Sequence, residues 1–245
     1  MISFLFSSRK KDNPDHDLLL LLKSFTHFTT PEERSKCEFV IKFDEDDDEI
    51  EELKKFLEEG DSGLIVKTFT WAQNGGRNSL HEVQSLLYGY IDPKVTWIQV
   101  IADDFVFTRP NFVTEILESE NNYNYIGVED EPVTRSIAPC FSRTLLDACC
   151  GYFGPQPNAD GFSTALRQIM LKKYDIDIGI DIPVYYQRKH GRQSEQWQEN
   201  HNKIMKDFDV LNIIHQLVSR NVFLCMQEKK NEKIHSYIPN YPLSK

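Results

Sequence analysis

Two adjacent carboxylates, Asp103 and Asp104, come one residue after the apolar run Val95–Ile101, which is typical of a buried strand. In α/β proteins, ligands bind at the edge of the sheet where the parallel strands have their carboxyl ends. Paired hard oxygens suit Mg²⁺ or Mn²⁺, which is normally shared with the phosphates of a substrate. The pair therefore indicates a divalent-cation site beside a phosphorylated ligand. The alternative is a capped turn, where Asp is also common.

The acidic run Asp44–Glu49 follows the strand that the sequence predicts at Glu38–Phe43. Its alternating aspartates are similar to a calcium loop, but Glu49 stands at the position of the turn glycine and Lys55 at that of the bidentate glutamate. An EF-hand is therefore excluded. We interpret the later acids of the run as residues that favour a helix N-terminus. We predict that Asp44, at the end of the strand itself, contacts a ligand.

Two further polar segments stand at similar places. Ser7-Ser8-Arg9 follows the strand predicted at Ile2–Phe6, and Gly75-Gly76-Arg77 precedes a helix. Glycines allow a backbone to approach a phosphate closely, and an Arg can hold one through two hydrogen bonds. Each segment by itself could be an ordinary loop. Because the carboxyl ends of parallel strands meet at one edge, we expect these segments to converge with Asp44 and Asp103.

The elements that position these residues alternate between short strands and longer helices, which is typical of an α/β fold with a mostly parallel sheet flanked by helices. In the first half the sequence predicts strands at Ile2–Phe6, Glu38–Phe43, Leu64–Phe69 and Val95–Ile101, with helices at Asp15–Phe28, Asp48–Glu59 and Asn78–Tyr90. The second half is less regular. It predicts helices at Asn111–Ser119, Ser142–Cys150 and Asp160–Lys173, a β-rich stretch at Tyr123–Pro139, a strand at Asp177–Tyr186 and helix from Ser194 onward.

Composition sets the broad class. The chain has 245 residues, 40% of them hydrophobic, and 28 basic against 38 acidic side chains give a net charge of −10. This composition excludes intrinsic disorder and argues against nucleic-acid binding, which requires a basic face. Five cysteines without a C-x-x-C pair favour a reducing, cytoplasmic location. The longest aliphatic run, Leu18–Leu22, is too short to span a membrane, so we expect a protein that is soluble or at most peripheral to a membrane.

The order of these segments resembles the GT-A glycosyltransferases, particularly the family 2-like enzymes. The resemblance rests on Ser7-Ser8-Arg9, Lys42-Phe43-Asp44-Glu45-Asp46-Asp47, Gly75-Gly76-Arg77 and Ile101-Ala102-Asp103-Asp104. It implies a Rossmann-like GT-A domain over residues 1–245. Residues 1–115 would form the nucleotide-sugar and metal-binding half, and residues 116–245 an acceptor-binding α+β half with C-terminal helices.

The resemblance also implies roles for individual residues. On the donor side, Asp44 would contact the nucleobase, Arg77 the pyrophosphate and Asp103 the ribose, while Asp104 would hold Mn²⁺ or Mg²⁺. His190 stands where some family members bring a histidine to the metal; the alternative is a solvated loop histidine. Asp160 would be the catalytic base; the alternative is that it caps the helix that follows.

The activity implied is transfer of a sugar from a nucleoside-diphosphate donor, expected to be UDP-linked, to a hydroxyl of a glycan or related acceptor. Inversion at the anomeric carbon is expected, and a retaining mechanism stays open. Two alternatives remain from the residues themselves. A nucleotidyltransferase would show a glycine-rich phosphate loop after the first strand, and Ser7-Ser8-Arg9-Lys10-Lys11 has no glycine. A non-catalytic sugar- or partner-binding module of the same fold would bind no nucleotide through a metal.

Overall fold

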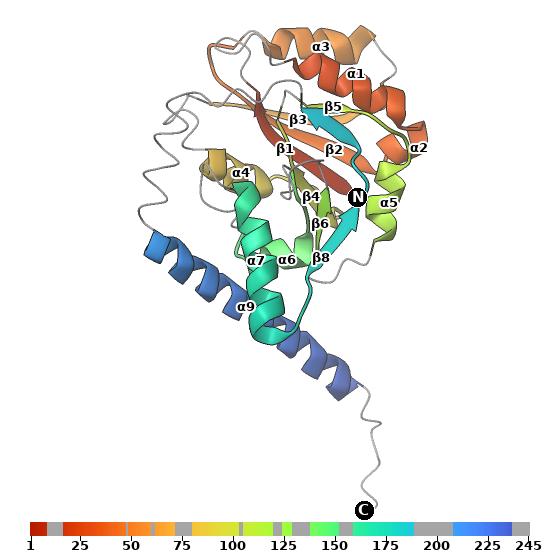
Figure 1. The fold of residues 1–245 in the computed structure, drawn as a ribbon. Helices are drawn as coiled ribbons and strands as arrows, with labels where there is room; N and C mark the ends of the chain where they lie inside the picture. Colours follow the sequence, from red (N-terminus) through yellow and green to blue (C-terminus); the bar gives the residue numbers. More distant parts are fainter. Residues whose placement is uncertain are drawn as a thin grey trace, which may run out of the picture.

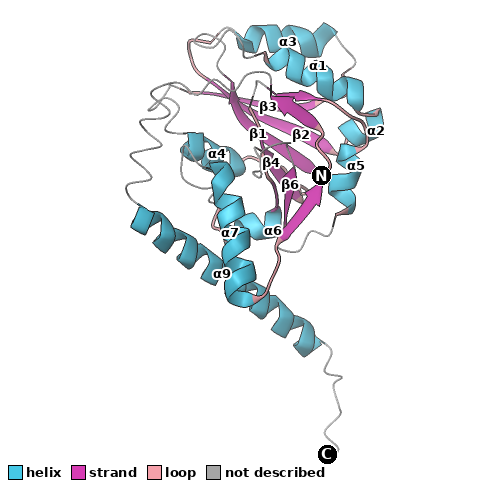
Figure 2. Cartoon of the chain, in the orientation of Figure 1, coloured by secondary structure: helices cyan, strands magenta, loops and turns pink. Residues whose placement is uncertain are grey.

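The computed structural model describes residues 1–8, 17–47, 49–59, 62–71, 80–102, 105–119, 124–128, 138–151, 159–188 and 208–236. Within these residues the chain forms one large sheet covered by helices on both faces, together with a small two-stranded sheet (Figures 1 and 2). The α/β class predicted from the sequence is confirmed.

The large sheet has seven strands in the order β3-β2-β1-β4-β7-β6-β8. Its first half consists of parallel strands, namely β1 (Ile2–Ser8), β2 (Cys37–Phe43), β3 (Ile65–Thr70) and β4 (Trp97–Val100). The central strands β1 and β2 are buried on both faces, which explains their nearly continuous apolar sequences. The four strands predicted for this half are therefore present.

The second half adds β7 (Cys140–Ser142), β6 (Tyr125–Val128) and β8 (Gly179–Ile182). Of these, β7 runs antiparallel to both of its neighbours, β4 and β6, whereas β8 is parallel to β6. All strands of the large sheet except β7 therefore point in the same direction. The small sheet pairs β5 (Phe105–Phe107) antiparallel with β9 (Tyr186–Arg188).

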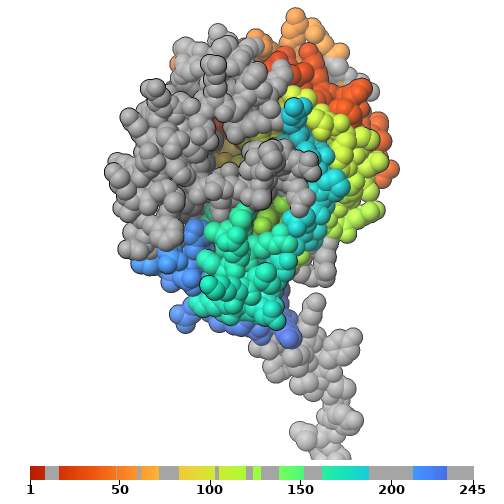
Figure 3. All heavy atoms as spheres, in the orientation of Figure 1, coloured from red at the N-terminus to blue at the C-terminus, as the bar shows by residue number. Residues whose placement is uncertain are grey.

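Helices divide into two layers. One face of the sheet is covered by the small sheet and by α1 (Leu18–Phe28), α3 (Glu49–Glu59) and α5 (Phe112–Glu118). The other face is covered by α4 (Leu80–Tyr88), α6 (Arg143–Ala148), α7 (Ala159–Tyr174) and α9 (Phe208–Ser236). Figure 3 shows α7 and α9 at the surface on the side of the molecule away from α1 and α3. The short helix α2 (Pro31–Arg34) precedes β2 and therefore lies at the amino ends of the strands.

The sequence-based prediction differs from the structure in three respects. The strand predicted at Asp177–Tyr186 is divided between β8 and β9, and Pro183 lies in the break, where its lack of an N–H ends the ladder. The strands β5 and β7 were not predicted, since each has only three residues. The helix α2 was also missed, although Thr30 and Glu33 form a capping box at its start.

No helix within the described residues is long and apolar enough to cross a membrane. All five cysteines are free. Burial raises the pKa of the Cys149 thiol to about 12. The expectation of a single domain over residues 1–245 stays a prediction.

Candidate functional site

Three predicted site residues are fully described, namely Ser7, Ser8 and Asp44. Asp160 lies in the first turn of α7, but its side chain is outside the described residues. The other predicted residues, Arg9, Arg77, Asp103, Asp104 and His190, also lie outside the described residues. At the carboxyl edge of the large sheet, the described residues are therefore those at the ends of β1 and β2 and those that contact them.

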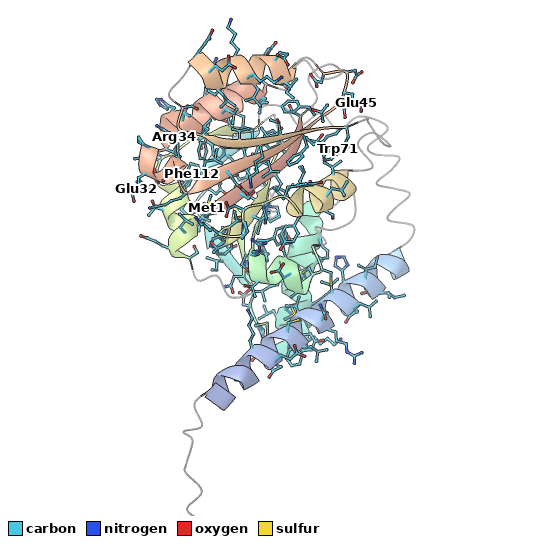
Figure 4. All side chains as sticks on the ribbon, turned by 180° about the vertical axis from the view of Figure 1, so that it is seen from behind. Met1, Glu32, Arg34, Glu45, Trp71 and Phe112 are labelled. Carbon is cyan, nitrogen blue, oxygen red and sulfur yellow. The ribbon has the colours of Figure 1, made fainter. Side chains whose placement is uncertain are left out.

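The carboxyl ends of the central strands meet as the sequence predicts. Ser8 is paired with Phe43 in the β1–β2 register, so Asp44 follows directly beside the end of β1. On the other side of β1, the amide of Ile101 donates to the carbonyl of Leu5 at 3.1 Å, so the residue that follows β4 lies beside β1, two positions before Asp103 in the sequence. Figure 4 shows Glu45 and Trp71 at one end of the strands, with Met1, Glu32 and Arg34 at the other.

Asp44 forms an ion pair with Lys42, and both side chains are almost completely buried, at 3% and 4% exposure. The Lys42 ammonium also lies 5.9 Å from the ring centroid of Trp71, a distance suited to a cation–π contact. The amide of Trp71 donates to the carbonyl of Phe43 at 3.3 Å, so the Trp71 backbone extends the β2–β3 pairing to this edge. The Asp44 carboxylate is thus held beside an ammonium and an indole ring.

Lys42 and Trp71 were not among the predicted site residues. The sequence did contain a signal for Lys42. This lysine lies within the otherwise apolar strand β2, and a lysine that is buried there needs a partner or a ligand for its charge. Trp71 immediately follows a strand at the edge where ligands bind, but a lone tryptophan is usually part of a core.

Glu49, the first residue of α3, has a role that the sequence did not reveal. Its side chain is 2% exposed, and it accepts hydrogen bonds from the Ser8 hydroxyl at 2.5 Å and from the Leu18 amide at 3.2 Å. Its own amide donates to an Asp47 carboxylate oxygen at 3.1 Å. Glu49 therefore contacts the end of β1 and the start of α1 at once. We interpreted it from the sequence only as an acid that favours a helix N-terminus.

The position of Asp160 follows from the direction of α7. This helix ends at Tyr174 and β8 begins at Gly179, so only four residues separate them and the helix runs antiparallel to β8. Because β8 points in the same direction as β1, the N-terminus of α7 lies toward the carboxyl edge of the sheet. The helix begins at Ala159, so Asp160 lies inside the first turn and not at the capping position before it.

The small sheet pairs residues that are close in the sequence to Asp104 and His190, the two residues predicted to bind a metal. Phe105, directly after Asp104, is paired with Arg188, two residues before His190. The first residue of β5 therefore lies beside the last residue of β9. No cluster of three or more His, Cys, Asp or Glu side chains is present among the described residues.

One open groove of about 460 Å³ lies elsewhere, between α1 and α3. It is lined by Leu19, Phe56 and four charged side chains of both signs, namely Lys23, Glu52, Lys55 and Glu59. Ser7, Ser8 and Asp44, the predicted site residues whose side chains are described, do not line this groove, so we do not assign the donor site to it.

Comparison with known proteins supports the fold. No family model and no curated protein matches the sequence. Among solved structures, a mannosyltransferase from Pyrobaculum calidifontis in complex with GDP-mannose and Mn²⁺ matches with a TM-score of 0.57 at 12% identity, covering 94% of this chain and 75% of that one.

Two further solved structures align less well. A 4-diphosphocytidyl-2C-methyl-D-erythritol synthase from Anaerococcus prevotii has a TM-score of 0.49 at 9% identity, covering 84% of this chain and 98% of that one. Mouse xyloside xylosyltransferase 1 has a TM-score of 0.40 at 11% identity, covering 73% and 76%. The match to the mannosyltransferase supports the assignment of the fold: the chain has the GT-A-like fold that its sequence motifs predict.

Proposed function

We propose that the chain is a nucleotide-sugar-dependent transferase, and specifically a glycosyltransferase that moves a sugar from a nucleoside diphosphate, UDP by preference, to an acceptor hydroxyl. The observation that carries this proposal is the convergence of Ser8, Asp44 and the chain leading to Asp103 on one edge of a GT-A-like sheet. The similar mannosyltransferase was solved with a nucleotide sugar and Mn²⁺, which agrees with a donor site of this kind.

The donor would lie along this edge. The ends of β1 and β2 supply Ser7, Ser8 and Asp44. Arg9, which follows β1 in the sequence, and Arg77, which follows β3, would bind the diphosphate. Asp44 is the acceptor proposed for the nucleobase, with Asp103 for the ribose. A chain with a net charge of −10 requires local cations to hold a diphosphate, and these arginines provide them.

A divalent cation would be held by Asp104 together with His190. The pairing of Phe105 with Arg188 supports this assignment, because Phe105 directly follows Asp104 in the sequence and Arg188 precedes His190 by two residues. Carboxylate and imidazole form a donor set that suits Mn²⁺. When bound, the ion would neutralise the charge that develops on the leaving diphosphate.

Asp160 would act as the base on the acceptor side. The direction of α7 supports this role, because it brings the first turn of the helix to the edge where the donor is proposed to bind. The acceptor oxygen forms a bond to the anomeric carbon while the bond from that carbon to the diphosphate oxygen breaks. Asp160 takes the acceptor proton, and in-line attack inverts the configuration.

Calorimetric titration with UDP, GDP and CDP, with and without Mn²⁺, tests the proposal. The variants are Asp104→Asn and, as a matched control, Glu32→Gln. Glu32 is an exposed carboxylate on α2, at the opposite end of the strands (Figure 4). We expect Mn²⁺-dependent binding of a diphosphate, strongest for UDP, that is lost in Asp104→Asn and unchanged in Glu32→Gln.

The product then separates the alternatives. Transfer of the sugar to an acceptor, or slow hydrolysis of a UDP-sugar to UDP, agrees with a glycosyltransferase. Release of pyrophosphate from a nucleoside triphosphate and a sugar phosphate would instead identify a nucleotidyltransferase. Absence of nucleotide binding by the wild type, with and without Mn²⁺, would refute the proposal and favour a non-catalytic module.

A further inference from the structure

Glu49 joins three elements at the carboxyl edge through one buried side chain. Its carboxylate accepts from the Ser8 hydroxyl, at the last residue of β1, and from the Leu18 amide, at the first residue of α1. Glu49 itself begins α3, directly after the turn that follows β2. We propose that Glu49 is a positioning residue, which fixes the ends of β1 and β2 and the start of α1 relative to one another for nucleotide binding. The functional part of this inference rests on the proposed donor site.

The two carboxylate oxygens of Glu49 accept from different elements. Oε2 accepts from Ser8, and Oε1 accepts from Leu18, whose amide is among those at a helix N-terminus that lack an intrahelical partner. Asp17 is the N-cap of α1, but its side chain accepts from the Leu20 amide. Glu49 thus provides a cap for α1 that is 31 residues away in the sequence. Burial makes such bonds costly to lose, because the donors would be left away from water.

The turn that contains Asp44 is tied to the same residue. The Asp47 amide donates to the Asp44 carbonyl at 3.2 Å, and the Asp47 carboxylate accepts from the Glu49 amide at 3.1 Å. A displacement of Glu49 therefore reaches Asp44 through two hydrogen bonds and reaches Ser8 through one. Both of these residues are proposed donor-site residues, so a change at Glu49 would be transmitted to both.

Glu33 offers a matched control, because it is a second buried glutamate that stabilises a helix start. It is 7% exposed, accepts from the Thr30 amide at 2.9 Å and accepts from the Thr114 hydroxyl at 3.1 Å. Its helix, α2, precedes β2, so Glu33 lies at the amino ends of the strands, away from the proposed donor site. Loss of either glutamate removes a comparable set of hydrogen bonds, but only Glu49 is placed to affect nucleotide binding.

The experiment compares Glu49→Ala, Glu49→Gln and Glu33→Ala in the full chain. Calorimetry with UDP and Mn²⁺ measures nucleotide affinity, and backbone hydrogen exchange measures protection at Leu18 and Asp47. Gln retains the length of the side chain: its amide oxygen can accept from Leu18, and its NH₂ group can donate to Ser8, since a hydroxyl also accepts. Glu49→Gln therefore controls for the loss of the charge. If Glu49→Ala does not fold, Glu49→Asp takes its place: its shorter side chain should lose at least one of the two contacts and weaken UDP binding, and unchanged affinity would overturn the inference.

We expect Glu49→Ala to weaken UDP binding by about tenfold or more and to reduce protection at Leu18 and Asp47. Glu49→Gln is expected to stay within about threefold of the wild type, and Glu33→Ala to lower the melting temperature without changing affinity. Unchanged affinity and unchanged protection in both Glu49 variants would overturn the inference. Equal loss of affinity in Glu33→Ala would also overturn it, because the effect would then be general destabilisation.

The two proposals can fail separately. If the wild type binds no nucleotide, the proposed function fails, and hydrogen exchange still decides whether Glu49 fixes the edge. Loss of protection at both Leu18 and Asp47 in Glu49→Ala, but not in Glu33→Ala, would support the positioning role; unchanged protection would refute it. If nucleotide binds with equal affinity to the wild type and to a folded Glu49→Ala variant, the positioning role is refuted and the proposed function stands.

Discussion

Replacing Lys42 with methionine tests whether the charges of Lys42 and Asp44, the buried ion pair at the carboxyl edge, stabilise each other as their geometry indicates. Lys42 and Asp44 are 4% and 3% exposed, so the pair is shielded from water on almost every side. Methionine retains most of the volume and the apolar stem of lysine but removes the ammonium. The Asp44 carboxylate would then stay buried without its counter-charge, which is unfavourable in an environment of low dielectric constant.

The size of the effect follows from this burial. Breaking a buried pair by removing one partner costs about 3–5 kcal/mol, which is a large part of the roughly 5–15 kcal/mol that stabilises a typical domain. For a chain of this length, each kcal/mol shifts the melting temperature by about 2–4 °C, so we expect a decrease of roughly 6–20 °C. Removing both charges in Lys42→Met with Asp44→Asn should cost much less than the sum of the two single changes, because no unpaired charge is then left behind.

Urea unfolding, followed by tryptophan fluorescence, measures these free energies for the four members of the double-mutant cycle. Trp71 lies beside Lys42, so its emission also reports on the pair directly. Each single variant should unfold at a clearly lower urea concentration than the wild type, with most of the loss recovered in the double variant. A cost below about 1 kcal/mol for Lys42→Met, or additive effects of the two changes, would refute the coupling.

Three further predictions concern the scaffold. Phe25→Ala should cost about 3–5 kcal/mol in thermal unfolding, because this fully buried ring contacts four other phenylalanines. Arg109→Ala should destabilise the chain to urea at neutral pH, and this penalty should shrink as the pH falls below about 4. The hydrogen bond from Arg109 lowers the pKa of Glu115, so the stability that it supplies is present above the ordinary carboxyl pKa and is lost on acidification. Cys150 is exposed and should react with a thiol reagent at pH 8, whereas Cys149, whose pKa burial raises to about 12, should react only after unfolding.

The first half of the fold could be predicted from the sequence because its central strands, β1 and β2, are buried on both faces. Such strands appear as apolar runs, and the predicted run Glu38–Phe43 differs from β2 by one residue at its start. The second half was harder because its short strands depend on distant partners. β7 is defined by pairing with β4 and β6, and three residues carry no period that identifies a strand.

The candidate site was predictable to a similar degree. The positions where strands end predicted that Ser8 and Asp44 would be neighbours, and the β1–β2 register brings them together. The partners of these residues were not predictable, because an ion pair or a hydrogen bond between side chains depends on tertiary packing. From the sequence, Lys42 was predicted only as part of the strand Glu38–Phe43, and Trp71 was assigned no role.

Glu49 shows most clearly why a local interpretation of an acidic run is incomplete. The acids before α3 are favourable near its N-terminus through the helix dipole, and that argument applies about equally to each of them. The structure distinguishes Glu49 from the others because its carboxylate lies against the Leu18 amide and the Ser8 hydroxyl, which belong to other elements. Because both carboxylate oxygens of Glu49 accept from other elements, substitution of Glu49 should affect the protein differently from substitution of its exposed neighbours. Glu49→Ala can be compared with Glu51→Ala, which removes an exposed carboxylate of the same helical turn that pairs with Lys54. Both changes remove the interaction with the helix dipole, but Glu49→Ala also removes the contacts to Ser8 and Leu18, so the difference between them measures this specific contact.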